Sequence, residues 1–388
     1  VWEDDREGER NVYAQLMNPE GQNLWVEDIH VNSGGLGFSP SLVIDQNGNA
    51  VVVWDDRRAV YAQKLDVKGN KLWSSDERVD LSSNWPTSTD VAMDAQGNII
   101  VVWEEDSNDY GDIYAQKMSP GGNRLWAADV QVNSDTTTER QLTPKVAVDT
   151  EGNVFVVWAD ERDKGWNSSI CYDDIYAQRL DANGDRIWGN DVLVSSGGYA
   201  CNPDIAVDGS GNAFVVWEER SSNLATLYAQ RLNTTGGDIW EQDLQIDSEE
   251  SSFYGPSLYP SVTINSAEQA VVAWWNDGPS DIVFAQSLNS LGETVWGKTQ
   301  VNVSGAQQKF GGISITTDET NNTFIAWEDW WGGNADVFIQ QFDNGGIRLW
   351  GSDVQLVSPD YFYFSFGVSQ SRTIDTVTDN IREATLTG

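Results

Sequence analysis

The chain has little of what most catalytic sites need. Its 388 residues contain a single histidine, His30, two cysteines, and 23 Lys and Arg against 60 Asp and Glu. A lone histidine has no partners for a metal cluster or a Ser–His–Asp triad. No G-x-S-x-G, H-E-x-x-H or phosphate-cradling loop is present. The sequence therefore favours a protein that binds over one that catalyses.

Two further absences narrow the class of partner. The formal net charge of −37 argues against nucleic acid, because phosphate contacts need clustered Lys and Arg. No apolar run is long enough for membrane insertion. The chain begins with Val and shows no signal peptide, which fits either a removed leader or a piece of a longer polypeptide or assembly.

What the chain has in excess is tryptophan, and 14 of its 19 tryptophans are arranged in a repeat. A phrase such as DIYAQKMSPGGNRLW (residues 112–126) occurs seven times, with an aromatic residue and a tryptophan always 12 positions apart, as in 126 − 114. These pairs are Tyr13/Trp25, Tyr61/Trp73, Tyr114/Trp126, Tyr176/Trp188, Tyr228/Trp240, Phe284/Trp296 and Phe338/Trp350. Another tryptophan precedes each phrase, at Trp2, Trp54, Trp103, Trp158, Trp217, Trp274 and Trp327.

Each repeat predicts four antiparallel strands, which we name A to D. Strand A is typified by PSLVID, the apolar strand B by AVVVW and strand C by VYAQKLD, and strand D begins at KLW. Four strands repeated about every 50 residues are typical of a β-propeller. We predict an all-β, seven-bladed β-propeller, with an array of two-sheet sandwiches as the alternative.

The blades are expected at residues 1–39 plus 365–388, 40–85, 86–143, 144–202, 203–259, 260–312 and 313–364. The first blade lacks its own strand A, because the chain starts inside strand B. We expect residues 365–388 to pair with the N-terminal blade and close the ring, which removes open strand edges.

The turn between strands C and D carries a family resemblance. Its D-x-x-G-N-x-L-W pattern is similar to the Asp-box of sialidase-like propellers and to the tryptophan-docking motif of quinoprotein propellers. The whole phrase, with DIYAQ and LW, resembles the repeats of secreted bacterial and archaeal surface proteins. The resemblance implies the architecture. The arginine triad of sialidases and the adjacent cysteines of quinoproteins cannot be assigned here.

The D–A and B–C connections share one face of a propeller, and these are the connections that vary in length here. This variable-loop face is therefore the expected binding surface. Acidic residues follow the strand-B tryptophans on it, among them Asp55, Asp56, Glu104, Glu105, Glu218 and Glu219. Such oxygens suit Ca²⁺. Arginines that follow them, such as Arg57 and Arg220, suit salt bridges within the scaffold equally well, and no other cofactor is required.

Aromatic residues in the same connections suit sugar rings or a protein partner. The candidates are Trp330, Trp331, Trp166, Tyr110, Trp85, Tyr254 and Trp275. The best patch is expected at EDWWGGNAD, because two adjacent tryptophans do not easily both point inward. The alternative is that these side chains cover the core beneath the loops.

The two cysteines, Cys171 and Cys201, are expected on that face too, and a disulfide between them would indicate an oxidising compartment. Four N-x-S/T sequons start at Asn167, Asn233, Asn302 and Asn321. We predict a non-catalytic extracellular or cell-surface propeller that binds a glycan or protein, or assembles into a surface structure. The alternative is a glycosidase or lyase with acidic residues in the central funnel. An isolated carboxylate pair would favour the enzyme.

Overall fold

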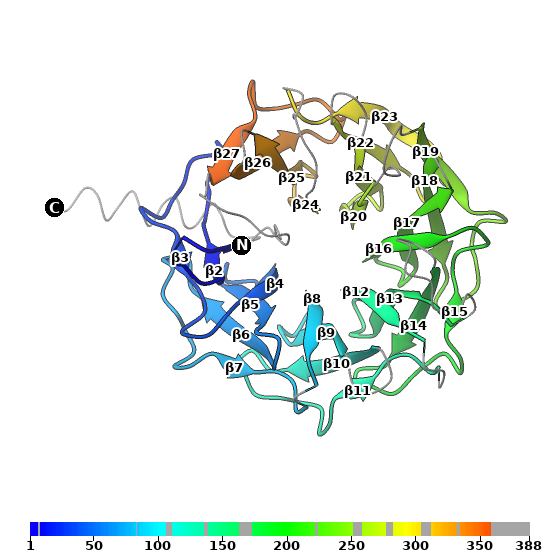
Figure 1. Ribbon diagram of the computed structural model, residues 1–388. Coiled ribbons are helices and arrows are strands. Elements are labelled where there is room, and N and C mark those ends of the chain that lie inside the picture. The colour runs from blue at the N-terminus through cyan, green and yellow to red at the C-terminus, as the bar shows by residue number, and fades with distance from the viewer. Residues whose placement is uncertain are drawn as a thin grey trace.

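Seven antiparallel sheets form a closed ring around a central axis (Figure 1). The computed structural model describes residues 1–357 apart from 7, 83, 106–110, 136–138, 163–172, 222–223, 251–257, 277–281, 304–311 and 332–333. For residues 249, 250, 330, 331, 334, 335 and 357 it describes the backbone alone. Within these residues no helix is long and apolar enough to cross a membrane.

The strands follow one another blade by blade in chain order. Blades 1 and 2 contain β1 (Trp2–Asp4), β2 (Asn11–Ala14), β3 (Ile29–His30), β4 (Phe38–Ile44), β5 (Ala50–Asp55), β6 (Val60–Leu65) and β7 (Glu77–Arg78). Blades 3 and 4 contain β8 (Pro86–Met93), β9 (Ile99–Glu105), β10 (Asp112–Met118), β11 (Val130–Gln131), β12 (Gln141–Val148), β13 (Val154–Asp160), β14 (Asp174–Leu180) and β15 (Val192–Leu193). Blade 5 contains β16 (Ala200–Val207), β17 (Ala213–Ser221), β18 (Leu224–Leu232) and β19 (Leu244–Glu250). Blades 6 and 7 contain β20 (Ser261–Ile264), β21 (Ala270–Asn276), β22 (Ile282–Leu288), β23 (Thr294–Gln300), β24 (Ile313–Thr317), β25 (Thr323–Trp331), β26 (Asn334–Phe342) and β27 (Val354–Val357).

The second strand of each blade supplies the core between neighbouring sheets. Its apolar run is covered on both faces, because each blade packs against the blade on either side. The tryptophan of this strand is almost fully buried in six blades, at Trp54, Trp103, Trp158, Trp217, Trp274 and Trp327. Each of these six indoles lies opposite the repeated aromatic residue of the third strand, as Trp54 pairs with Tyr61. The repeated phrase is therefore the core of a blade.

Two polar turns hold each complete blade at its other end. At the A–B turn, Asp45 Oδ1 accepts the backbone amides of Asn47 (2.8 Å) and Asn49 (2.9 Å). Its Oδ2 also pairs with Lys64 Nζ at 2.8 Å. At the C–D turn, Asp66 Oδ1 accepts amides in the same way. Asp is favoured at both places because its short side chain bonds the turn amides.

The closing tryptophans join each blade to the next. Trp25 Nε1 donates to the carbonyl of Val67 in blade 2 at 3.1 Å, and Trp126 Nε1 donates to that of Ala182 in blade 4 at 3.1 Å. The glycine of the receiving turn lets the indole approach, since a Cβ added to Gly122 would lie 3.2 Å from the Trp73 ring. The seventh contact runs from Trp350 Nε1 to the Pro19 carbonyl (3.0 Å) and joins blade 7 to blade 1.

The structure confirms the seven-bladed all-β fold and differs from the expected strands in two details. In six blades strand D starts after the closing tryptophan, as in β7 at residues 77–78, because that indole docks on the next blade. In blade 6, β23 begins at Thr294 and includes the closing Trp296. Strands β4, β12 and β16 begin at residues 38, 141 and 200, slightly before the expected blade boundaries. A bulge, with Ser39 at φ 49° in blade 2, extends their pairing to strand B.

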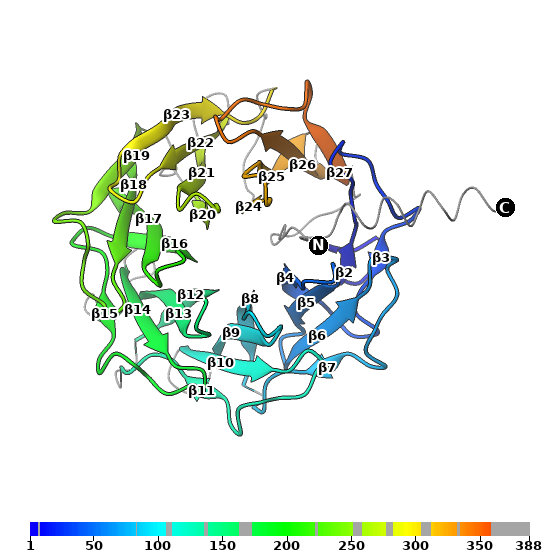
Figure 2. The same ribbon diagram turned by 180° about the vertical axis from the view of Figure 1, so that it is seen from behind.

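Six blades have four strands, and blade 1 has three among the described residues, with β1 as its innermost strand (Figure 2). The segment predicted to complete it, residues 365–388, lies outside the described residues. Pairing of that segment with the N-terminal blade therefore stays a prediction.

Candidate functional site

The aromatic residues predicted on the binding surface have different environments in the structure. Trp85, in the connection between β7 and β8, is 63% exposed. Trp275 was expected on the loop face but lies within β21, is 4% exposed and packs in the core beside Trp327. The backbone of Trp330 and Trp331 continues β25, which forms a hairpin with β26. Tyr110, Trp166 and Tyr254 lie outside the described residues.

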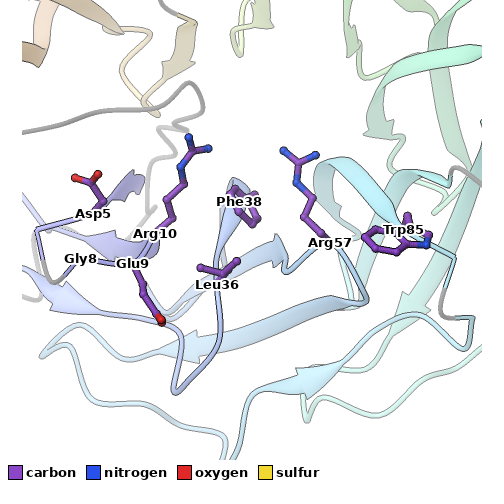
Figure 3. A pocket seen from close by; sticks show the side chains of 8 residues that line it. All are labelled: Asp5, Gly8, Glu9, Arg10, Leu36, Phe38, Arg57 and Trp85. Carbon is purple, nitrogen blue, oxygen red and sulfur yellow. The ribbon is translucent and has the colours of Figure 1, made fainter.

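Trp85 lies beside an open pocket between blades 1 and 2, on the variable-loop face. The pocket has a volume of about 620 Å³ and is lined by Asp5, Gly8, Glu9, Arg10, Leu36, Phe38, Arg57 and Trp85. We call it the blade 1–2 pocket (Figure 3). Its residues come from the β1–β2 and β5–β6 connections, from the β3–β4 and β7–β8 connections and from the start of β4.

Two arginines share one aromatic ring in this pocket. The guanidinium carbon of Arg57 lies 4.7 Å from the centre of the Phe38 ring, and that of Arg10 lies 5.3 Å from it. Both guanidinium groups extend to the same side, whereas Glu9 points the other way (Figure 3). Cation–π contacts of this kind hold a guanidinium in place over the ring.

Two buried carboxyl groups lie beneath the arginines. Glu3 Oε1 accepts the Ser39 amide at 2.7 Å, and Glu3 Oε2 lies 3.9 Å from Arg10 Nη1. Asp55 Oδ1 accepts the Arg57 amide at 3.1 Å and lies 3.7 Å from Arg57 Nε. Burial raises the pKa of Glu3 to about 7, and burial likewise raises the pKa of Asp55 to about 7. Burial therefore favours the neutral form of each carboxyl group.

The other acidic residues proposed as calcium ligands have protein partners. Glu105 Oε2 and Glu219 Oε1 each accept a strand-B indole N–H at 3.3 Å, from Trp103 and Trp217. Glu218 pairs with Arg220 at 2.5 Å, Glu104 lies 3.6 Å from Arg140, and Asp56 Oδ1 accepts the amides of Arg58 and Ala59. Within the described residues, no three His, Cys, Asp or Glu side chains cluster as metal ligands would.

A polar belt runs along the innermost strands β4, β8, β12, β16 and β20. It consists of Ser41, Asp90, Lys145, Asp204 and Ser261 at one register position. Asp90 accepts the Ser41 hydroxyl and the Val146 amide, both at 3.0 Å, and Lys145 Nζ lies 3.9 Å from it. Asp204 Oδ2 accepts the Ser261 hydroxyl at 2.9 Å and the Val262 amide at 2.8 Å. These carboxylates fasten adjacent blades together.

Cys201 lies in β16, is 5% exposed, and its Sγ is 3.1 Å from Glu218 Oε1. Cys171 lies outside the described residues, so a bridge between the two cysteines stays a prediction.

The sequence pointed to Trp85 and to the acidic residues after the strand-B tryptophans, but it missed Arg10 and Phe38 as parts of a pocket. One signal was available for Phe38. Its position at the start of strand A is occupied by Thr87, Leu142, Cys201 and Leu258 in blades 3 to 6. An aromatic ring at one copy of a repeated position indicates a local role that the repeat does not require. Arg10 carries the same kind of signal, because the residue eight positions after the strand-B tryptophan is Gly111 in blade 3 and Ala225 in blade 5.

The fold is similar to that of several solved propellers at low sequence identity. An ulvan lyase, a polysaccharide lyase bound to -[GlcA(1-4)Rha3S]-, matches with a TM-score of 0.55 and 11% identity over 85% of this chain and 87% of that one. The Hadza microbial sialidase Hz136 matches at 0.52 and 11%, over 84% and 69%. AofleA from Arthrobotrys oligospora matches at 0.51 and 9%, over 86% and 90%. No protein-family model and no curated protein matches the chain.

Proposed function

We propose that this protein is a non-catalytic, extracellular or cell-surface propeller that binds a glycan in the blade 1–2 pocket. The observation that carries the proposal is Trp85, an indole 63% exposed beside a pocket that also presents two guanidinium groups. The C–H face of a sugar stacks on an aromatic ring while its hydroxyls bond to charged side chains. The solved propellers named above include proteins that act on glycans, but identities near 11% extend only to the fold.

Binding to a glycan array tests the proposal. Trp85→Ala should weaken the affinity for any bound glycan by about 30-fold, since an aromatic side chain at the centre of a binding site contributes about 2 kcal/mol. Tyr199→Ala is the matched control, because Tyr199 is 41% exposed but does not line the pocket. The double variant Trp330→Ala/Trp331→Ala tests the other predicted patch. If the wild type binds no glycan, the proposal is wrong, and binding of a protein partner or assembly into a surface structure becomes the preferred function.

A second candidate function rests on Glu3 and Asp55. Two buried carboxyl groups with pKa values of about 7 beside a pocket are the groups that a glycosidase or lyase uses for proton transfer. Both, however, follow the strand-B tryptophan, a place where acids recur as scaffold. Release of reducing ends or of unsaturated sugars by the wild type, abolished by Glu3→Gln and by Asp55→Asn, would establish the enzyme. Unchanged polysaccharide would exclude it for the substrates tested.

A further inference from the structure

The outermost strand of each blade has one edge with which no other strand pairs among the described residues (Figure 1). Such edges invite pairing with another chain, and proteins limit this by keeping edge strands short or charged. Four of the outer strands, β3, β7, β11 and β15, have two residues each, and β27 has four. β19 has seven residues but carries Asp247, Glu249 and Glu250. All six of these edges are therefore short or charged.

β23 is the exception. It also has seven residues, and its sequence TVWGKTQ contains no acidic residue. Its one charged side chain, Lys298, pairs with Asp247 of blade 5 at 2.5 Å. Negative charge keeps protein molecules apart, and this chain has a net charge of −37. Of the outer strands that the structure describes, β23 alone is both long and free of acidic residues.

Exposed aliphatic side chains accompany this edge. Leu291 and Ile347 are 72% and 65% exposed, at two turn positions where the other blades have polar residues or glycine. Val295, in β23 itself, is 42% exposed. The turn with Ile347 lies against β23, since a Cβ added to Gly346 would lie 2.6 Å from the Trp296 ring. These departures from the repeat bring apolar surface to the rim of blades 6 and 7.

We propose that two copies of this chain associate by antiparallel pairing of their β23 edges, centred on Gly297. In this register, Val295 of one copy lies opposite Thr299 of the other, and Trp296 lies opposite Lys298. No like charges face each other, and both copies use the same surface, as a two-fold axis requires. The same pairing of β19 would place Asp247 opposite itself.

Two neighbours of the edge define the extent of the pairing. Arg348 Nη2 donates to the carbonyls of Gln300 (3.0 Å) and Val301 (2.7 Å), so we place the pairing at residues 295–299. The blade 1–2 pocket lies on the far side of the ring (Figure 1). Association therefore goes beyond glycan binding and does not depend on it, and a dimer would present two such pockets.

Sedimentation equilibrium of the whole chain tests the proposal, between about 1 and 100 μM. We expect the mass to rise from 43.0 kDa towards twice that value. Added salt should strengthen the dimer, because it screens the repulsion between two acidic copies. Val295→Glu/Thr299→Glu places like charges opposite each other at two places and should weaken association by about tenfold or more. Val295→Glu/Thr299→Lys changes the same positions but places opposite charges there, and should associate at least as tightly as the wild type.

Leu193→Glu is the matched control, because Leu193 is 49% exposed in β15, the outer strand of blade 4. It should leave association unchanged, and thermal unfolding shows whether each variant is folded. A wild type that stays monomeric throughout overturns the inference and leaves the edge to a strand of another protein. A dimer that survives Val295→Glu/Thr299→Glu overturns it by placing the interface elsewhere. Loss of association in both double variants, with folding intact, refutes the register. Glycan binding stands or falls separately.

Discussion

Asp94→Asn is the substitution for which the structure gives the sharpest expectation. Asp94 Oδ1 accepts two amides of the A–B turn in blade 3, and its Oδ2 lies 2.9 Å from Lys117 Nζ. Burial alone would raise the pKa of Asp94, but bonds from Asn98 and Lys117 outweigh it and hold the pKa below its ordinary value. Asn keeps an oxygen for the turn amides and removes the charge. Lys117, 6% exposed, then has no counter-charge.

Removing one partner of a buried ion pair costs about 3–5 kcal/mol. For a chain of 388 residues the unfolding entropy is roughly 0.8 kcal/mol per kelvin, so the melting temperature should fall by about 4–6 °C. The assay is thermal unfolding at pH 7, followed by tryptophan fluorescence. Because the Asp94 pKa is lowered in the folded state, the pair stabilises at neutral pH and its contribution is lost as the pH falls below 4.

Asp66→Asn is the matched control. Asp66 Oδ1 accepts the Lys68 and Asn70 amides at 2.8 Å each, which is the same turn chemistry without a buried lysine. We expect a loss below about 0.5 kcal/mol. Lys117→Met added to Asp94→Asn should recover most of the stability, because both charges are then absent. Equal losses in Asp94→Asn and Asp66→Asn would refute the reasoning and assign the whole effect to the turn.

Three further outcomes are expected. The first concerns Glu3, whose folded-state pKa of about 7 lies above the ordinary value of 4.5. The buried carboxyl group therefore lowers the free energy of unfolding as the pH rises from 4.5 to 7. Compared with the wild type, Glu3→Gln should be more stable by up to about 3 kcal/mol at pH 8 and equally stable at pH 4. Equal effects at both pH values would contradict the raised pKa, and the exposed Glu27→Gln serves as control. Added calcium should change the melting temperature by less than about 1 °C, because the acidic residues described above have partners within the protein. A larger rise would support calcium binding. Alkylation of the denatured, unreduced chain should modify neither Cys171 nor Cys201 if they are bridged, and any labelling would exclude the bridge.

Local pattern was enough to predict the architecture. The constant interval between aromatic residue and tryptophan reflects a hairpin whose two ends are fixed by cross-strand pairing and by docking on the next blade. Such contacts recur once per repeat, so they leave a periodic signal in the sequence. The turn acids have the same origin, because each bonds amides within four residues of itself.

The candidate site could be predicted only in part, since it depends on distances that span blades. Trp275 directly follows a strand-B tryptophan, at the point where strand B was expected to end and a loop to begin. In the structure, β21 continues through Trp275, and the neighbouring blade covers its side chain. Trp85 was expected to be exposed because it lies in a D–A connection, and these connections vary in length; its side chain is 63% exposed. Its neighbours in the pocket belong to three different connections and to the start of β4, and no spacing rule joins them.

By itself, the sequence determined the all-β class, the sevenfold repeat, the buried tryptophans and the face on which variation gathers. Only the tertiary structure decided that Arg10 and Arg57 meet on Phe38, and that Glu3 and Asp55 are buried beneath them. The physical reason is the sequence separation of the contacts. Hydrogen bonds of turns and hairpins join residues close in the chain, whereas burial and charge compensation depend on contacts with the neighbouring blade.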